Sequence, residues 1–381
     1  MTRKRLMTDL FRDKMANSAR RVSHTLLRWP AWAAYAASAW SLIYGALGIY
    51  WTFGGSGFPF GAANDPEGAA LSILAGVQVE TAAPVIAAMG LVGAVVGLAM
   101  AWTWGRGFSR TVLLGIAWSF AAVLLLVVPD ARGLLVTALV PIVLIGAPFG
   151  WPSENFFDAI PWPVMNQFVL TGGGFLWVAA AVAYQRRSRN ACMNCGRSDT
   201  DTGWTTPAAA ARWGRWATAV AAIVPLVYAT TRLAWELGIP LGISEEILRT
   251  GQAGGGLWSG VALSTVAVGG AIFTLGLIQP WGEIFPRWLP LLGGKRVSIW
   301  LAVVPASLVS VLVAMAGLMF VRKTVLGNSF FTLTDGWAAI GPVLLWPIWG
   351  VALGAATLAY YYRRRGRCRH CGLGRTITGG N

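Results

Sequence analysis

Eight long apolar segments occupy most of this chain and restrict it to membrane-protein folds. Each is close to the roughly 20 residues that an α-helix needs to cross the hydrocarbon core of a bilayer. Hydrophobic residues make up 56% of the 381 residues and charged residues only 12%, which is about half the charged share of a soluble domain. We therefore predict an all-α polytopic transmembrane protein. The eight segments lie at about residues 31–53, 82–104, 111–128, 163–184, 216–238, 257–279, 298–320 and 337–361.

A ninth apolar stretch, at 133–149, differs from the other eight in length and composition. It has only 17 residues and contains Pro141, Gly146 and Pro148. A helix of that length reaches roughly 25 Å, which is short for a full crossing. We expect a re-entrant or interfacial segment, because irregular backbone at membrane depth is tolerated only against protein or a water-filled cavity.

The basic residues gather on one predicted side of the membrane. The net charge is +15, and 25 of the 30 Lys and Arg residues lie in segments that an eight-crossing topology places together. These segments include the N-terminal residues 1–28, the centre of the chain and the C-terminal tail. Such a bias is the positive-inside signature, and it predicts that both termini are cytoplasmic. In a membrane protein it favours anionic lipid headgroups over nucleic acid as a partner.

The two halves of the sequence match each other in order, which indicates an internal duplication. We predict two tandem four-helix repeats in the same orientation, as in transporters with parallel repeats. The predicted parts are a basic N-terminal segment (1–28), a first repeat (29–198), a linker (199–211), a second repeat (212–373) and a tail (374–381). The matched features are Tyr44 and Trp51 with Tyr228 and Trp235, the Gly-x-Pro-x-Gly pentapeptides at 57–61 and 238–242, the Trp-Gly pairs at 104–105 and 281–282, and the Cys-x-x-Cys-Gly motifs at 192–196 and 368–372.

The two Cys-x-x-Cys-Gly motifs contain all four cysteines of the chain: Cys192, Cys195, Cys368 and Cys371. Two thiolates at this spacing can bind one metal ion, and two such motifs supply the four tetrahedral sulfur ligands that zinc prefers. We predict one structural zinc site that joins the two halves. A redox-active dithiol, a regulatory disulfide and inert thiols are the alternatives, and His370 is a possible replacement ligand.

A second candidate site contains Arg232 and Glu236, which are four residues apart on one face of a predicted membrane helix. Ionisable groups inside a membrane are costly and often functional. Their counterparts in the first repeat are Gly48 and Thr52, so the pair breaks the repeat. A substrate or proton site is one hypothesis, and an ion pair near the outer end of the helix is the other.

Asn166 and Gln167 are polar residues at the start of a predicted membrane helix, where they need hydrogen-bond partners. We expect them to face the protein interior, and a cavity between the repeats would bring them near Arg232 and Glu236. The chain contains no phosphate-binding loop, zinc-protease motif or nucleophile-elbow motif. We therefore do not expect an enzyme.

Three stretches of the chain, at 235–242, 281–288 and 346–350, resemble a group of actinobacterial polytopic membrane proteins. That group has no assigned biochemical activity, so the resemblance implies no catalytic or binding residues. It implies a multi-pass protein of the bacterial inner membrane.

Two classes of function are compatible with these observations. The first is transport of a small solute through a cavity between the two repeats. The second is a non-enzymatic sensing, scaffolding or regulatory membrane protein with a cytoplasmic zinc or thiol cluster. A cavity lined by Arg232, Glu236, Asn166 and Gln167 would favour transport, whereas a dry, packed interface between the repeats would favour the second class.

Overall fold

The described part of the computed structural model is helical. The described residues contain no β-strand, and their β pairing is limited to one isolated antiparallel bridge between Ile284 and Arg296. The predicted N-terminal segment and most of the tail lie outside the described residues. The described residues are 29–146, 148, 160–198, 203–253, 256–288, 293–327, 336–368 and 370–374.

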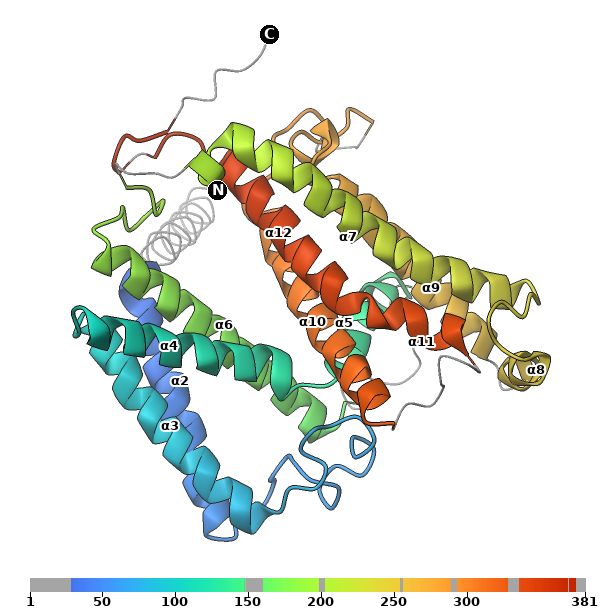
Figure 1. Cartoon of the computed structure of the whole chain (residues 1–381), viewed down its shortest axis with the longest axis horizontal. Helices are drawn as coiled ribbons and strands as arrows, with labels where there is room; N and C mark the ends of the chain where they lie inside the picture. Colours follow the sequence, from blue (N-terminus) through green and yellow to red (C-terminus); the bar gives the residue numbers. More distant parts are fainter. Residues whose placement is uncertain are drawn as a thin grey trace, which may run out of the picture.

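The helices form two groups along the chain (Figure 1). The first group contains α2 (Trp29–Thr52), α3 (Val79–Ala101), α4 (Phe108–Ala122), which continues as the π-helical turn η1 (Val123–Val127), α5 (Arg132–Gly146) and α6 (Trp162–Ser188). The second group contains η3 (Gly203–Thr205), α7 (Pro207–Glu236), α8 (Glu245–Ala253), α9 (Gly256–Leu275), η4 (Pro280–Gly282), α10 (Ile299–Val325), α11 (Trp337–Leu344) and α12 (Trp346–Arg364).

Six of the helical segments are long and apolar enough to cross a membrane. A multi-pass membrane protein is therefore supported, whereas the predicted set of eight crossings stays a prediction. α2 has sufficient length, but its Trp, Tyr and Ser residues lower its hydropathy, and the apolar part of α9 is short. The six are α3, α4 with η1, α6, α7, α10 and α11 with α12.

The two groups pack their helices in the same pairwise order. In the first group, α2 packs against α3 and α6, and α4 packs against α6. In the second group, α7 packs against α9 and α12, and α10 packs against α12. Each group has its own apolar core, with Trp177 and Tyr184 fully buried in the first and Tyr360 in the second.

Small residues bring α2 and α3 into close contact. A Cβ atom added to Gly48 would lie 2.5 Å from the backbone nitrogen of Ala87, and Gly45 faces Gly90 in the same way. Ser38 donates a hydrogen bond of 2.7 Å from its hydroxyl to the carbonyl of Ala94. Helices in membranes associate largely through such close packing, because moving an apolar side chain from lipid into a helix interface brings little hydrophobic free energy.

Matching hydrogen bonds tie the helix ends together at the end of the bundle where α6 and α12 finish. We call this end, which carries residues 189–198, 365–368 and 370–374, the cysteine end. The hydroxyl of Tyr184 donates to the carbonyl of Trp104 at 2.5 Å, and that of Tyr360 donates to the carbonyl of Gly282 at 2.7 Å. These bonds join the last helix of each group to the turn that follows its second long helix.

Arginines near the ends of α6 and α12 make a second matching pair of hydrogen bonds, to carbonyls at or just after the ends of α3 and α9. Arg187 donates to the carbonyl of Ala101 at 3.0 Å, and Arg363 donates to the carbonyl of Leu277 at 2.9 Å. Arg363 also pairs with Glu283 at 2.7 Å. The two groups therefore close their cysteine ends in the same way and position the segments that follow α6 and α12.

The Gly-x-Pro-x-Gly pentapeptides also adopt matching turns. Gly57 and Gly61 have φ angles of 81° and 82°, and Gly238 and Gly242 have φ angles of 77° and 63°. Left-handed backbone of this kind is accessible to glycine at little cost, which explains the repeated glycines. The turns lie at the opposite end of the bundle, after α2 and α7.

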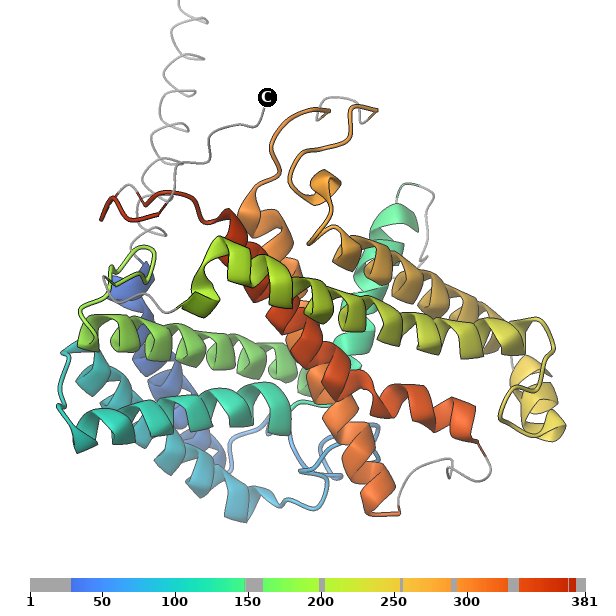
Figure 2. The ribbon, with the colours of Figure 1, turned by 45° about the horizontal axis from the view of Figure 1, so that its top comes forward.

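Apolar side chains fill much of the junction between the two groups, and a hydrogen bond crosses it, from the guanidinium of Arg322 to the carbonyl of Leu71 at 3.1 Å. α10 of the second group packs against η1 and α5 of the first group (Figure 2). We call α5 the inserted helix, because the described part of the second group has no helix that matches it. Leu312, Met315 and Ala316 of α10 are at most 1% exposed and pack with Leu134 and Trp346. The predicted re-entrant stretch is helical from Arg132 through Gly146, and the full course of 133–149 lies partly outside the described residues.

Candidate metal centre

The four cysteines converge at the cysteine end. Their sulfur atoms all lie within 4.8 Å of one another, although the two motifs are 176 residues apart in sequence. Cys192 approaches Cys368 at 3.9 Å between sulfurs, and Cys195 approaches Cys371 at 3.6 Å. Each group of helices contributes two of the four sulfurs.

The two motifs fold into the same turn. In the first, the backbone N–H of Cys192 donates to the carbonyl of Arg197 at 2.8 Å, and that of Gly196 donates to Cys192 at 2.7 Å. In the second, the N–H of Cys368 donates to Leu373 at 2.9 Å, and that of Gly372 donates to Cys368 at 2.9 Å. The final glycines have φ angles of 72° and 73°.

The sulfur geometry suits a tetrahedral metal ion. Zinc binds thiolate sulfur at about 2.3 Å, so four tetrahedral ligands lie about 3.8 Å apart. Two of the sulfur–sulfur separations, 3.6 and 3.9 Å, bracket that value, and the others lie within 4.8 Å. The backbone N–H of His370 donates to the sulfur of Cys368 at 3.4 Å, an orientation that also stabilises a thiolate. The four sulfurs could therefore hold a metal ion, and zinc is compatible with them.

The thiols differ in burial and in acidity. Cys195 and Cys368 are each 7% exposed, whereas Cys371 is exposed. Burial raises the pKa of Cys195 to about 12. Burial also raises the pKa of Cys368, but hydrogen bonds from backbone N–H groups and neighbouring thiols outweigh it and lower that pKa to about 6. These thiols therefore differ in acidity, and binding a metal requires all four to lose their protons.

Arginines hold the two cysteine motifs against each other. Arg197 from the first motif donates to the carbonyls of Gly366 and Leu373 at 2.8 and 3.0 Å. Arg365, which precedes the second motif, donates to the carbonyl of Cys195 at 3.2 Å. These bonds cross between the two groups of helices. They form a second set of contacts around the sulfurs, of the kind that orients metal ligands.

His370, the possible replacement ligand, lies inside the second motif. Its backbone N–H bonds to sulfur, and its imidazole is not part of the group of ligand atoms found among the described residues.

Arg232 and Glu236 do not form an ion pair with each other in the described part of the chain. The guanidinium of Arg232 lies over the rings of Tyr228 and Trp235, at 4.7 and 4.3 Å from their centroids. It also donates to the carbonyl of Ala339 at 3.2 Å. Glu236 points at Gly260 of α9 instead.

Asn166 and Gln167 face the interior of the first group, in agreement with the expectation from the sequence. Asn166 is 1% exposed and accepts a hydrogen bond of 2.9 Å from the hydroxyl of Tyr44. Gln167 accepts one of 3.3 Å from the backbone N–H of Asp130. Among the described residues, no hydrogen bond or ion pair joins either of them to Arg232 or Glu236.

A buried charge cluster at the opposite end of the bundle was not foreseen from the sequence. Arg132 pairs with Asp65 at 2.5 Å and with Asp130 at 2.8 Å, and both carboxylates are at most 7% exposed. The guanidinium contacts Asp65 through two nitrogens, in a bidentate arrangement. The cluster anchors the start of α5 to the loop that follows α2. Only the close spacing of Asp130 and Arg132 offered a sequence signal.

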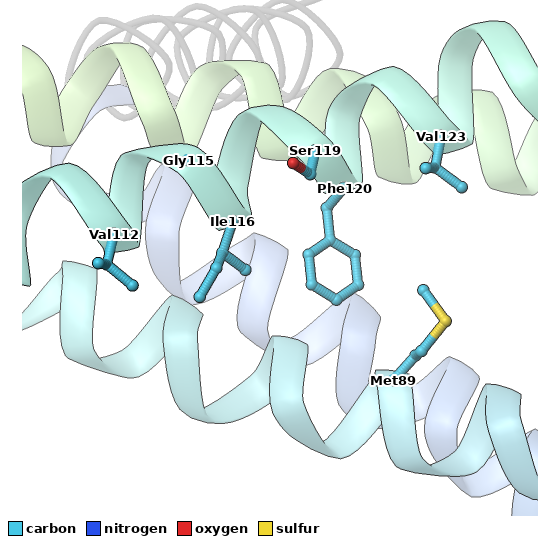
Figure 3. A pocket seen from close by; sticks show the side chains of 7 residues that line it. All are labelled: Met89, Val112, Gly115, Ile116, Ser119, Phe120 and Val123. Atoms are coloured by element: carbon cyan, nitrogen blue, oxygen red, sulfur yellow. The ribbon is translucent and has the colours of Figure 1, made fainter.

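An apolar groove lies within the first group, between α3 and α4 (Figure 3). Met89 contributes from α3, and Val112, Ile116 and Phe120 contribute from α4. Its volume is about 390 Å³, and the groove does not include any of the predicted site residues. It therefore supports no polar-solute site.

Comparisons with known proteins do not extend this picture: no protein-family model, curated protein or solved structure matches the chain.

Proposed function

We propose that this protein is a non-enzymatic membrane protein of the sensing, scaffolding or regulatory class, in which one zinc ion clasps two tandem repeats. The observation that carries the proposal is the convergence of four sulfurs, two from each repeat, within 4.8 Å. A site assembled from both halves makes their relative arrangement depend on metal, which is how a metal ion can report on or fix a conformation.

The shared contacts support a duplication. Both groups pair their helices in the same order and fold their cysteine motifs into the same turn. Tyr184 and Tyr360 occupy matching positions and donate to carbonyls of the matched Trp-Gly turns. A parallel repeat of this kind puts the ends of α6 and α12 on one side of the membrane, where two cysteine motifs can meet.

The junction between the halves supports the regulatory class over transport. Leu312, Met315 and Ala316 are buried there against apolar partners. The polar residues that a solute pathway would use are dispersed: Asn166 bonds within the first half, and Arg232 stacks on aromatic rings within the second. A transport cavity between the repeats would bring such groups together.

Zinc suits this donor set better than other common cations. Soft thiolate ligands select zinc, copper(I) or iron, and four sulfurs in a tetrahedral arrangement indicate zinc or iron. Calcium and magnesium require oxygen ligands. We assign the cysteine end to the cytoplasm of a bacterial cell, where thiols stay reduced and available to metal.

Metal analysis of the purified full-length protein tests the proposal. We expect one zinc per chain, and none after all four cysteines are changed to serine. Limited proteolysis in the linker between Ser198 and Gly203 should accelerate when a chelator removes the metal. Normally folded protein without stoichiometric metal, in which the four-serine variant resists protease equally well, would contradict the clasp.

We also propose that anionic lipid headgroups meet the cysteine end. Several cations there are exposed and make no hydrogen bond or ion pair through their side chains in the described part of the chain, unlike Arg187 and Arg197. Exposed tryptophans accompany them, including Trp216 and Trp288 at 78% and 80% exposure. Basic residues near an anionic membrane surface contribute about 1 kcal/mol each. The free cations are Arg106, Arg189, Arg212, Arg215, Arg287, Lys295 and Arg296.

Thermal unfolding in lipid nanodiscs tests this partner. Nanodiscs with phosphatidylglycerol should stabilise the protein relative to pure phosphatidylcholine, and changing Arg287, Lys295 and Arg296 to Gln should reduce the difference. Arg249→Gln is the control, because Arg249 belongs to α8 and is paired with Glu245. Equal stability in both lipids would argue against the contact.

A further inference from the structure

We propose that oxidation of the metal-free cysteine centre forms two disulfide bonds that join the two halves of the protein. The pairs are Cys192 with Cys368 and Cys195 with Cys371. The inference rests on the proposed function and deepens it, because it names a covalent modification of the same four cysteines and its oxidant class, a two-electron oxidant such as hydrogen peroxide.

The sulfur contacts favour pairing across the halves. In the part of the chain that the structure describes, two sulfur–sulfur contacts have hydrogen-bond geometry, at 3.9 Å for Cys192 with Cys368 and 3.6 Å for Cys195 with Cys371. Both contacts cross between the halves, and each joins matching positions of the two motifs. A disulfide needs about 2.05 Å between sulfurs, so each pair must approach by less than about 2 Å.

The surrounding backbone keeps these pairs opposed without a metal. Arg197 donates to two carbonyls of the second motif, and Arg365 donates to the carbonyl of Cys195 in the first. Within each motif, the N–H of the first cysteine and that of the final glycine are bonded inside the turn. Each motif therefore keeps its turn when the ion leaves, and the three arginine bonds hold the two motifs near each other although the metal no longer fixes their spacing.

Each cross pair combines an accessible sulfur with a buried one. Cys371 is exposed and its partner Cys195 is buried, while Cys192 is partly exposed and its partner Cys368 is buried. An accessible sulfur can react with an oxidant from solvent, and a buried neighbour can then resolve the product. A pair of this composition protects its second thiol from separate overoxidation.

The chemistry balances with one peroxide for each disulfide. The accessible thiolate attacks hydrogen peroxide, the O–O bond breaks, and a sulfenic acid forms with release of hydroxide, which takes a proton to become water. The buried partner gives up its proton and attacks that sulfur as a thiolate, the S–O bond breaks, and the hydroxide that leaves takes up that proton to form a second water. Two thiols are oxidised and one peroxide is reduced to two waters. The disulfide sulfurs no longer carry the negative charge that metal ligation needs.

The test uses the full chain with a specific protease site inserted between Ser198 and Gly203. The protein is freed of metal, treated with hydrogen peroxide, cleaved and run on a non-reducing denaturing gel. We expect the two halves to migrate as one band that separates after reduction, and peptide mapping to recover the two cross pairs. The Cys192→Ser, Cys195→Ser double variant keeps cysteines in one half only, and its halves should separate without reductant.

A second pair of variants keeps the test informative if one fails to fold. Cys195→Ser with Cys371→Ser leaves the contacting pair Cys192 and Cys368, which should still join the halves. Cys192→Ser with Cys371→Ser leaves two buried cysteines from different pairs and should give little joined product. Halves that separate after oxidation of the wild-type chain, with disulfides mapped inside each motif, would overturn the inference. Metal content measured before oxidation tests the proposed clasp separately, so either idea can fail alone.

Discussion

Tyr184 and Tyr360 anchor the last helices of the two halves to the matched Trp-Gly turns, Tyr184 through the carbonyl of Trp104 and Tyr360 through that of Gly282. Arg187 and Arg363, one turn further on, donate to carbonyls just before those turns. At the opposite end of the bundle the halves differ. Gly48 allows α3 to approach α2 closely, whereas the matching position in the second half holds Arg232, stacked between two aromatic rings. The shared contacts are thus those that position the four cysteines.

The first half also carries an element for which the described second half has no equivalent. α5 begins at Arg132, which is fixed between Asp65 and Asp130, and it packs against α10 of the other half. The inserted helix therefore joins the halves at one place while the cysteines join them at another. The comparison teaches that matching contacts position the cysteine end, whereas the rest of the junction uses α5, an element described in the first half only.

The largest expected effect on the free energy of unfolding comes from removing the charge of Arg132, whose ion pairs have no described counterpart in the second half. Arg132→Gln leaves two carboxylates buried with no cation, and breaking a buried ion pair typically costs about 3–5 kcal/mol. We expect a loss of that size in the free energy of unfolding, measured by denaturant titration in detergent. Arg249→Gln is the matched control, because Arg249 and Glu245 are 79% and 71% exposed and their pair contributes about 0–1 kcal/mol. Equal costs would show that the cluster does not stabilise α5.

The close contact between α2 and α3 gives the next largest effect. In Gly48→Ala, the new Cβ would meet backbone atoms of Ala87 and Ala83, which cannot move aside as a side chain can. Overpacking of this kind costs about 1–3 kcal/mol. Gly172→Ala is the control, because nothing lies within 4 Å of its Cβ position in α6, and alanine favours helix by up to about 1 kcal/mol over glycine.

Thermal unfolding of both variants checks this prediction. A Gly48→Ala protein as stable as the wild type would mean that α2 and α3 can move apart at little cost. The close approach at Gly48 would then not distinguish the first half from the second. A destabilised Gly172→Ala protein would mean that an unseen partner covers that face of α6.

The sequence was sufficient to predict the elements that depend on local pattern. Four cysteines in two identical short motifs, each following a helix of the same orientation, indicated a shared site, and the four sulfurs do converge. Helix boundaries were less accurate, because hydropathy follows the apolar run rather than the backbone hydrogen bonds. The predicted segment 216–238 omits the first turns of α7, which begins at Pro207 with Thr206 as its cap.

The charge cluster at Arg132 was beyond sequence reasoning for a physical reason. Asp65 is 67 residues away in a loop, and loop carboxylates usually remain solvated. Nothing in the local pattern distinguishes a buried loop carboxylate from an exposed one. The same holds for Arg232 and Glu236, whose four-residue spacing suggested an ion pair that their different neighbours prevent. Such partners are set by tertiary contacts.

The two cysteine motifs differ in the residue that follows the final glycine, which is Arg197 in the first half and Leu373 in the second. Arg197 donates across the halves to the carbonyls of Gly366 and Leu373. Loss of a contact that orients metal ligands typically lowers metal affinity about 10–100-fold. We expect Arg197→Gln to weaken zinc binding by that factor in a competition titration with a chromogenic chelator.

The control for Arg197 is Arg189→Gln, because Arg189 is exposed and its side chain makes no hydrogen bond or ion pair within the described part of the chain. It removes the same charge near the same site. A similar loss of affinity in both variants would assign the effect to net charge rather than to the bonds of Arg197.

The smallest expected effects test the match between the halves most directly. Tyr184→Phe and Tyr360→Phe each remove one hydroxyl that donates to a backbone carbonyl, and a hydrogen bond of this kind contributes about 0.5–1.5 kcal/mol. The rings stay buried, so packing is retained. The hydroxyl of Tyr360 also accepts a hydrogen bond from Arg364, so Tyr360→Phe should cost at least as much as Tyr184→Phe. The two costs should add in the double variant, since the sites share no partner. A cost confined to Tyr184 would mean that the second half is held by other bonds, and Arg364, which also donates to the carbonyl of Gly282 at 3.4 Å, is the group that would supply them.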